Sequence, residues 1–333
     1  MHTPLCDRLG IRAPIVQAPM GGASCPALAA AVSNAGGLGM IAASWTEGDD
    51  LRSLVRETKE MTSAPFGLNL VLEWDQRERL GVLLEEGARV VSYFWSALEP
   101  GSPYVEEAHQ AGALVMLTVG SAEEARRAVD AGVDVVVAQG LDAGGHVWGG
   151  VGTMSLIPAV VDAVAPAPVI AAGGIGDGRG LAAGLALGAQ AAWMGTAFVV
   201  ADESRSHPAY KDMVTRASEV DAVWSEGVFN DEWPQAPVRT LDNSTLRAWR
   251  AAGSPPPGER PGEGDVIATM PGGDPIPRYS VSNPTEEMTG EFEAMALYAG
   301  QSAALVRRRR PAAEIVEELL AQAAATIGRL PAT

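Results

Sequence analysis

The feature that most constrains the fold is a series of eight short apolar runs in the first two hundred residues. Each run has the length of a strand, and most are continuously apolar rather than alternating with polar residues. Such runs are typical of parallel strands that are buried on both faces of a sheet. The runs cover residues 14–20, 38–44, 66–72, 88–95, 113–119, 133–140, 168–174 and 191–199.

Helical stretches separate these runs, and several of them end in glycine, the residue that best adopts the left-handed conformation closing a helix. They cover residues 25–36, 49–62, 77–87, 103–112, 121–132, 156–164 and 178–188. Eight strands alternating with helices predict a (β/α)8 TIM barrel, an α/β fold, over residues 1–201. A doubly wound parallel sheet is the alternative.

The composition of the sequence changes after the barrel region, and the regular alternation of strands and helices ends. Residues 202–285 are rich in Pro and Gly and contain three tryptophans, which predicts an irregular, partly helical cap or lid over the active-site end rather than a free linker. Helical patterns return at 286–310 and 312–329. We therefore expect the C-terminal segment 286–333 to form helices that pack back on the barrel.

Composition excludes several classes of function. The net charge of −17 argues against a nucleic-acid or anionic-membrane partner, and the basic run 307–310 has the pattern of a solvated helix end. The apolar stretch 181–201 contains a turn signal and is predicted to be a helix followed by a buried strand. Cys6 and Cys25 make no disulfide framework, and no metal-ligand spacing occurs. With no signal-peptide pattern, the sequence indicates a cytoplasmic protein with no metal site; composition does not indicate the number of subunits.

Glycines cluster where barrel strands 7 and 8 are expected to end. Active sites of barrels lie at the C-terminal ends of the strands, and the last two strands commonly bind phosphate there. Gly173-Gly174 and Gly195-Thr196 occupy these positions, so together they predict a phosphate site. The segment 178–183 formally matches a dinucleotide fingerprint, but the next strand ends in no acidic residue for a ribose. A mononucleotide such as FMN fits this pattern better.

His146 is the histidine with the strongest functional indication. It follows two glycines directly after the sixth apolar run, at a predicted strand end. A neutral histidine there could act as an acid or base, although a loop histidine bonded to backbone is the alternative. The other histidines, His2, His109 and His207, lie in polar or acidic surroundings that favour solvated positions.

Three long motifs, in order, resemble those of the nitronate monooxygenase (2-nitropropane dioxygenase) family. They are "PIVQAPMGGASCPALAAAVSNAGGLGMI" at 14–41, "QGLDAGGH" at 139–146 and the segment 169–204, and the similarity extends to "EAMALYAGQS" at 293–302. Flavin-dependent enoyl-ACP reductases share these motifs. The resemblance implies an FMN-bearing barrel that oxidises alkyl nitronates, or nitroalkanes, with O2 to a carbonyl compound and nitrite.

The resemblance also implies roles for individual residues. His146 takes the position of the family's catalytic histidine, as a base or a substrate-positioning group. Asp142 departs from the family's usual Glu. From their positions in the sequence we also expect three aromatic residues to shape the substrate site: Trp95 at the end of the fourth run, Trp148 two residues after His146, and Tyr298 in the segment 293–302. The residues expected to contact FMN are Ala18, Pro19 and Met20 against the ring, Asn69 and Gln139 through hydrogen bonds, Gly144 and Gly145 as space for the ring or substrate, and Gly173, Gly174, Gly195 and Thr196 at the phosphate.

Two other functions remain open at this point. The first is NAD(P)H-dependent reduction of an enoyl thioester by the same flavin. The second is a non-catalytic protein that binds a flavin or another phosphate-bearing ligand. In the leading interpretation, the partners of the protein are O2 and a small nitronate or nitroalkane.

Overall fold

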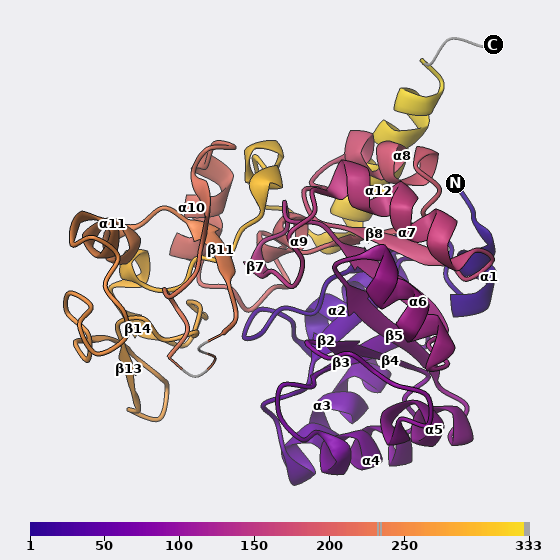
Figure 1. Ribbon diagram of the computed structural model, residues 1–333, viewed down its shortest axis with the longest axis horizontal. Coiled ribbons are helices and arrows are strands. Elements are labelled where there is room, and N and C mark those ends of the chain that lie inside the picture. The colour runs from indigo at the N-terminus through magenta and orange to yellow at the C-terminus, as the bar shows by residue number, and fades with distance from the viewer. Residues whose placement is uncertain (232, 234, 330–333) are drawn as a thin grey trace.

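A computed structural model describes residues 1–231, 233 and 235–329 and shows a barrel with a second lobe beside it (Figure 1). Eight parallel strands form one sheet in the order β1-β9-β8-β6-β5-β4-β3-β2. The two ends of this sheet, β1 and β2, are joined by backbone hydrogen bonds from Gln17 N–H to the Leu38 carbonyl and from Leu38 N–H to the Ile15 carbonyl. These bonds close the barrel. The strands are β1 (Ile15–Gln17), β2 (Gly39–Ala42), β3 (Phe66–Val71), β4 (Val90–Phe94), β5 (Leu114–Val119), β6 (Val135–Gln139), β8 (Val169–Ala172) and β9 (Ala191–Met194).

This closed sheet confirms the predicted (β/α)8 barrel and excludes the doubly wound alternative. Seven helices follow the first seven strands: α2 (Pro26–Asn34), α3 (Gly48–Met61), α4 (Arg77–Glu85), α5 (Pro103–Gln110), α6 (Ala122–Asp130), α7 (Thr153–Val164) and α8 (Gly178–Ala186). The eighth position is filled by α12 (Ala312–Ile327), which packs between α8 and α2. The whole second lobe is therefore inserted between the last strand of the barrel and its last helix.

The barrel has two buried apolar layers. One lies between the strands and the surrounding helices, and the other fills the interior with side chains such as Val16, Met40 and Val137. Helix α1 (Pro4–Leu9) contributes Leu5 to the interior layer and lies beside the residues that precede β6 and β9. It closes the N-terminal end of the barrel, which leaves the opposite end for the site.

The inserted lobe is held to the barrel by a small antiparallel sheet, β10-β11-β7. Its edge strand β7 (Gly145–His146) comes from the loop after β6, and it pairs with β11 (Val238–Leu241). The remaining elements of the lobe are α9 (Thr196–Val199), α10 (Pro208–Arg216), β10 (Ala222–Ser225), α11 (Ser244–Ala251), β12 (Val266–Thr269), β13 (Pro275–Pro277), β14 (Thr289–Gly290), η1 (Phe292–Ala294) and η2 (Gln301–Leu305).

Two predicted elements differ in the structure. The run 191–199 is a strand only to Met194, because the chain turns at Gly195 into the short helix α9. The helical structure expected over 286–310 is wrong: this segment holds the short strand β14, the 3-10 helices η1 and η2, and an extended stretch between η1 and η2. Residues 297–299 hydrogen-bond to β11 through Leu241 N–H to the Leu297 carbonyl and Ala299 N–H to the Arg239 carbonyl, which helical backbone could not do. The division at residues 201 and 285 stays a prediction.

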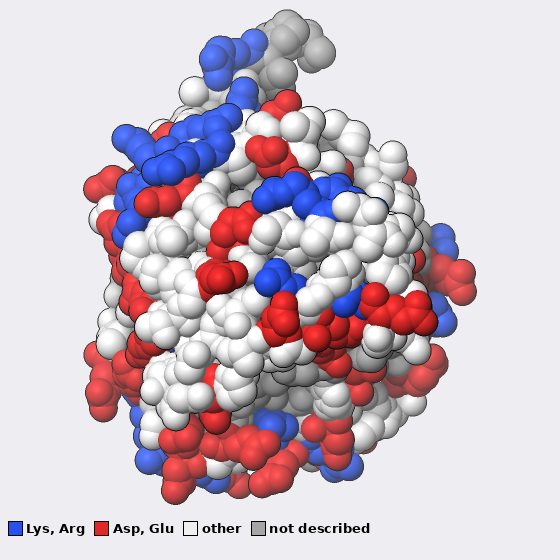
Figure 2. Space-filling view, turned by 90° about the vertical axis from the view of Figure 1, so that its left-hand side faces the viewer, with Lys and Arg blue, Asp and Glu red and all other residues white. Residues whose placement is uncertain are grey.

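The outer face of the inserted lobe carries charges of both signs. Across the described residues of the face in Figure 2, Asp and Glu side chains are spread widely and intermixed with Lys and Arg. Ion pairs account for part of this mixture, for example Arg247 with Asp242 and Glu293, and Arg205 with Glu287. In the part of the chain that the structure describes, no helix is both long and apolar enough to cross a membrane.

Candidate active site

A large pocket opens at the C-terminal ends of the barrel strands, where the inserted lobe meets the barrel. Its empty volume is about 1450 Å³, open solvent included. Without the open solvent the cavity volume is about 230 Å³, near the lower end of the roughly 300–1,000 Å³ that ligand pockets typically measure. The inserted lobe supplies part of its lining through Tyr210, Trp233, Val281, Asn283 and Tyr298.

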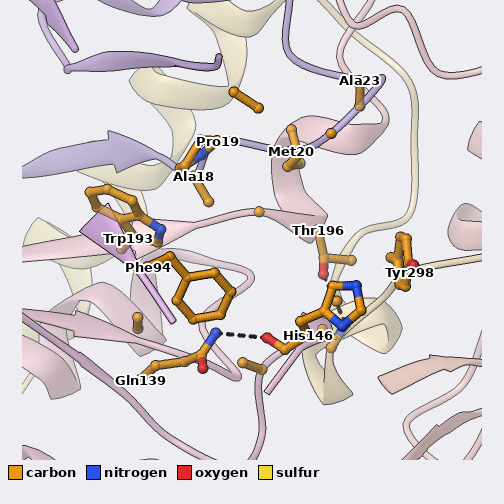
Figure 3. A pocket seen from close by; sticks show the side chains of 18 of the residues that line it. Ala18, Pro19, Met20, Ala23, Phe94, Gln139, His146, Trp193, Thr196 and Tyr298 are labelled. Carbon is orange, nitrogen blue, oxygen red and sulfur yellow. Dashed lines mark hydrogen bonds between the residues drawn. The ribbon is translucent and has the colours of Figure 1, made fainter. Parts of the chain in front are cut away.

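The structure brings most of the predicted site residues together around this pocket (Figure 3). The predicted residues that line it are Ala18, Pro19, Met20, Asn69, Gln139, Gly144, Gly145, His146, Gly173, Gly174, Gly195, Thr196 and Tyr298. Trp95 and Trp148 are not among the lining residues. They lie in a layer behind the wall, where Trp95 packs against Trp148 and the Trp148 indole N–H donates to Glu124 at 2.6 Å.

His146 is positioned by the pairing between the two lobes. Gly145 has φ +78°, a conformation that glycine adopts without strain, and this turn places His146 opposite Val238 of β11. The Gln139 amide nitrogen donates to the His146 carbonyl at 3.2 Å (Figure 3). The Gln139 amide oxygen accepts from the backbone N–H of Trp148 at 2.8 Å. Gln139 therefore uses one donor and its oxygen to fix the loop, which leaves one N–H for a ligand.

The imidazole of His146 is enclosed by aromatic rings. Ring centroids lie 4.2 Å away for Trp233, 5.7 Å for Tyr298 and 6.1 Å for Trp95. Burial lowers the pKa of His146 to about 4, and a backbone hydrogen bond to Ala236 opposes that shift. Its Nδ1 is buried and, among the described residues, has no hydrogen-bond partner. At neutral pH this ring is uncharged and can accept a proton or a hydrogen bond.

The glycines at the site are required for different structural reasons. A Cβ at Gly144 would lie 2.3 Å from the backbone nitrogen of Gly300, so Gly144 allows two backbone segments to touch rather than leaving space for a ring. Gly145 has open space on its Cβ side. Gly173 and Gly174 have φ values of +100° and +69°, which turn the chain sharply after β8. The Thr196 hydroxyl accepts a hydrogen bond from Gly300 N–H at 3.0 Å.

Asn69 and Asp142 also have defined partners. The Asn69 amide nitrogen donates to the Ser92 hydroxyl at 2.8 Å and to its carbonyl at 3.2 Å, so the amide oxygen is the atom left to accept from a ligand. Asp142 accepts from the Thr153 N–H at 2.7 Å and thereby holds the start of α7. It does not line the pocket, so the shorter side chain serves the loop structure.

The lining of the pocket carries no formal charge. Among the described residues that line it, there is no Asp, Glu, Lys or Arg. Nor do the described residues contain a cluster of His, Cys, Asp and Glu that could hold a metal ion. Any charged part of a ligand must therefore be met by N–H groups, hydroxyls and side-chain amides.

Sequence reasoning missed a buried arginine beneath the site. Arg239 of β11 is buried, and its guanidinium donates to the carbonyls of Ala143, Ala222 and Leu141 at 3.1, 2.8 and 2.9 Å. Burial lowers the pKa of this guanidinium. Arg239 thus fixes the loop between β6 and His146. No local signal in the sequence indicates this role, because the three acceptors lie 17 to 98 residues away.

We expect Arg239→Met to lower the free energy of unfolding by about 3 kcal/mol, because three buried carbonyls lose their donors. It should also lower kcat/KM, since the loop that carries His146 loosens. Urea unfolding and steady-state kinetics measure the two effects. Arg247→Met, at an exposed helix position, is the matched control. Equal stability of the two variants would contradict the role of Arg239.

Other missed residues line the pocket from several elements. They are Trp45 and Trp74 after β2 and β3, Phe94 at the end of β4, Trp193 in β9 and Trp233 in the inserted lobe. Only the closure of the barrel and the position of the lobe bring these five rings to one cavity.

Known proteins match this chain over nearly its whole length. The family model described as nitronate monooxygenase matches residues 2–79 and 73–322. A nitronate monooxygenase of Pseudomonas aeruginosa is 35% identical over 94% of this chain and 96% of its own length. The structure of FabK from Thermotoga maritima has a TM-score of 0.81 and 32% identity, covering 99% of this chain and 98% of that chain.

Other relatives have different names. The (3aS,4S,5R,7aS)-5-hydroxy-7a-methyl-1-oxo-octahydro-1H-indene-4-carboxyl-CoA dehydrogenase of Mycobacterium tuberculosis is 40% identical over 63% of this chain. The match spans only 59% of that dehydrogenase, less than two thirds of its length. The match to the family model and the near-complete coverage by the Pseudomonas protein decide the assignment. The chain belongs to the nitronate monooxygenase family and is an enzyme of that family.

Proposed function

We propose that this protein is an FMN-dependent oxidoreductase that oxidises alkyl nitronates, and nitroalkanes, with O2 to a carbonyl compound and nitrite. The observation that carries the proposal is the neutral imidazole of His146, whose buried Nδ1 has no partner in the described chain and which lines a large uncharged pocket. The family to which the chain belongs supports the same chemistry.

The residues of the pocket fit a flavin mononucleotide. Ala18, Pro19 and Met20 offer an apolar wall for a planar ring, and Asn69 and Gln139 each retain one polar group for it. The turn at Gly173-Gly174, together with Gly195 and Thr196, would hold the phosphate through backbone N–H groups, because glycine lets the backbone approach closely. When bound, the flavin supplies electron transfer from the substrate to O2.

His146 has two uses, according to the form of the substrate. A neutral nitroalkane is a weak carbon acid, so its α-carbon needs a base, and an uncharged imidazole can take that proton. A nitronate has already lost the proton, and His146 then orients it by hydrogen bonding. The rings of Trp233 and Tyr298 exclude water from the imidazole and keep it in its neutral form.

The experiment that tests the proposal follows purified protein through flavin binding and turnover. Flavin absorbance should be present, or should appear on addition of FMN. Oxygen uptake should then respond to a panel of nitronates and nitroalkanes without any requirement for NADH. Protein that shows no flavin absorbance even after addition of FMN would refute the flavin-dependent functions together.

Acidification should destabilise the fold through His146. Its pKa is about 4 in the folded protein and about 6.5 when unfolded, so the unfolded chain takes up the proton first as the pH falls. The loss begins near pH 6.5 and reaches up to about 3 kcal/mol by pH 4. Urea unfolding at pH 7, 5.5 and 4.5 measures it. His146→Asn should lose less stability than the wild type over this range; equal losses would show that His146 is not a buried neutral base.

The second candidate function is NAD(P)H-dependent reduction of an enoyl thioester. The observation in its favour is the mycobacterial relative, whose name specifies a carboxyl-CoA substrate. Consumption of NADH with a crotonyl thioester under anaerobic conditions would support this candidate, together with absence of oxygen uptake on nitronates. A non-catalytic ligand-binding role predicts instead that His146→Ala changes no turnover at all.

A further inference from the structure

Three tryptophans form a continuous aromatic path from the solvent to His146. Ring centroids are 6.3 Å apart for Trp45 and Trp74, 5.2 Å for Trp74 and Trp233, and 4.2 Å for Trp233 and His146. All four side chains line the same pocket. Their exposed fractions fall along the path, from 53% for Trp45 and 37% for Trp74 to 2% for Trp233.

The outer two rings are held in place although they are exposed. A Cβ at Gly21 would lie 3.5 Å from the Trp45 ring, so that ring lies over the loop after β1, next to Met20. Trp74 packs against Trp45 on one side and Trp233 on the other. Large apolar surface left in water at the mouth of a pocket marks a binding surface, because tryptophan offers much contact area at a small cost in side-chain entropy.

The absence of charge along the described lining decides which ligands suit this path. A substrate with a carboxylate or phosphate in addition to its nitro group would leave that second charge without a cationic side chain. An aromatic ring or a bulky alkyl group finds edge-to-face and tilted partners along the path. The reacting nitro carbon at one end of such a molecule can then lie at His146.

We propose that the enzyme prefers nitro compounds that carry an uncharged aromatic or bulky apolar group, which binds among Trp45, Trp74 and Trp233. This inference rests on the proposed function for the reaction and adds the substrate class. Trp45 and Trp74 determine specificity, because they touch the part of the substrate that does not react. Small alkyl nitronates contact only the inner end of the path.

The kinetic test compares three nitronates on the FMN-loaded protein: those of 1-nitro-2-phenylethane, nitroethane and 3-nitropropionate. We expect kcat/KM for the phenyl compound to exceed the other two by about tenfold or more. Trp74→Ala and Trp45→Ala should each reduce the ratio of phenyl to ethyl kcat/KM by about fivefold to tenfold. Trp224→Ala, which removes a tryptophan that is 39% exposed on β10 and outside the pocket lining, should leave the ratio unchanged.

A binding measurement separates this inference from the reaction itself. Calorimetric titration with 2-phenylethanol and with phenylacetate compares a neutral and a charged phenyl probe that cannot turn over. We expect the neutral probe to bind at least tenfold more tightly and Trp74→Ala to weaken it. Equal binding of the two probes, or a phenyl-to-ethyl ratio that neither tryptophan variant changes, overturns the inference. Absence of oxygen uptake with every nitronate refutes the proposed reaction. The titration alone then shows whether an uncharged aromatic group binds among Trp45, Trp74 and Trp233.

Discussion

Replacing His146 with asparagine is expected to lower kcat/KM for a neutral nitroalkane by about 10²- to 10⁴-fold, the usual contribution of a general base. Asparagine keeps a polar side chain of similar reach but cannot take up a proton. Burial lowers the pKa of His146 to about 4, so nearly every molecule carries a neutral imidazole at pH 7. The loss should be much smaller for the corresponding nitronate, because that substrate no longer carries the α-proton.

The control for this variant is His109→Asn. His109 lies in α5, pairs with Asp134 at 2.8 Å and does not line the pocket, so its replacement should leave both rates unchanged. Steady-state oxygen uptake with a nitroalkane and its nitronate gives the two values of kcat/KM. A His146→Asn variant that loses the same factor on both substrates would show that the imidazole positions the substrate and is not the base.

Gly144→Ala is expected to destabilise the protein strongly, because it forces two backbone segments apart next to the site. The added Cβ would lie 2.3 Å from the nitrogen of Gly300 and 2.4 Å from the carbonyl carbon of Ala299, and both are backbone atoms that cannot swing aside. The segment 299–301 must move, which breaks the bonds from Gly300 N–H to Thr196 and from Gln301 N–H to the Asp142 carbonyl. We expect a loss of about 3 kcal/mol in the free energy of unfolding, as for overpacking of a tight core.

Gly150→Ala is the matched control, because it lies in the same loop with no atom within 4 Å of its Cβ position and with an ordinary φ. Urea unfolding of the two variants measures the difference, and flavin affinity should fall with stability in the first alone. Gly144→Ala with wild-type stability would mean that the 299–301 segment does not contact this loop in solution.

The barrel could be predicted from the sequence because its signal is local. Each apolar run has strand length, and the alternation with helices leaves few architectures. The strand ends followed from the same pattern, and the family resemblance added the individual residues expected at them, most of which line one pocket. The incorrect predictions share one cause, which is a contact with a segment far away in the sequence. The stretch 297–299 is extended because it hydrogen-bonds to β11, and no periodicity within 286–310 indicates that partner.

The same limit applies within the site. Trp148 was expected near the substrate because it follows His146 by two residues, yet its hydrogen bond to Glu124 turns the ring behind the wall. Trp233 is separated from His146 by 87 positions in the sequence and packs against it at 4.2 Å. Arg239 reaches the loop only because β11 pairs with β7. These contacts depend on how the inserted lobe docks, which is a tertiary property.

The most direct test of the proposed chemistry is one vessel that contains FMN-loaded protein, air-saturated buffer and propan-2-nitronate, without NADH. Dissolved oxygen and nitrite are followed together. If the pocket around His146 oxidises nitronates, oxygen falls and nitrite rises in step as soon as the nitronate is added. Steady oxygen and no nitrite, in protein that oxidises NADH anaerobically with a crotonyl thioester, would contradict it and assign the pocket to enoyl-thioester reduction.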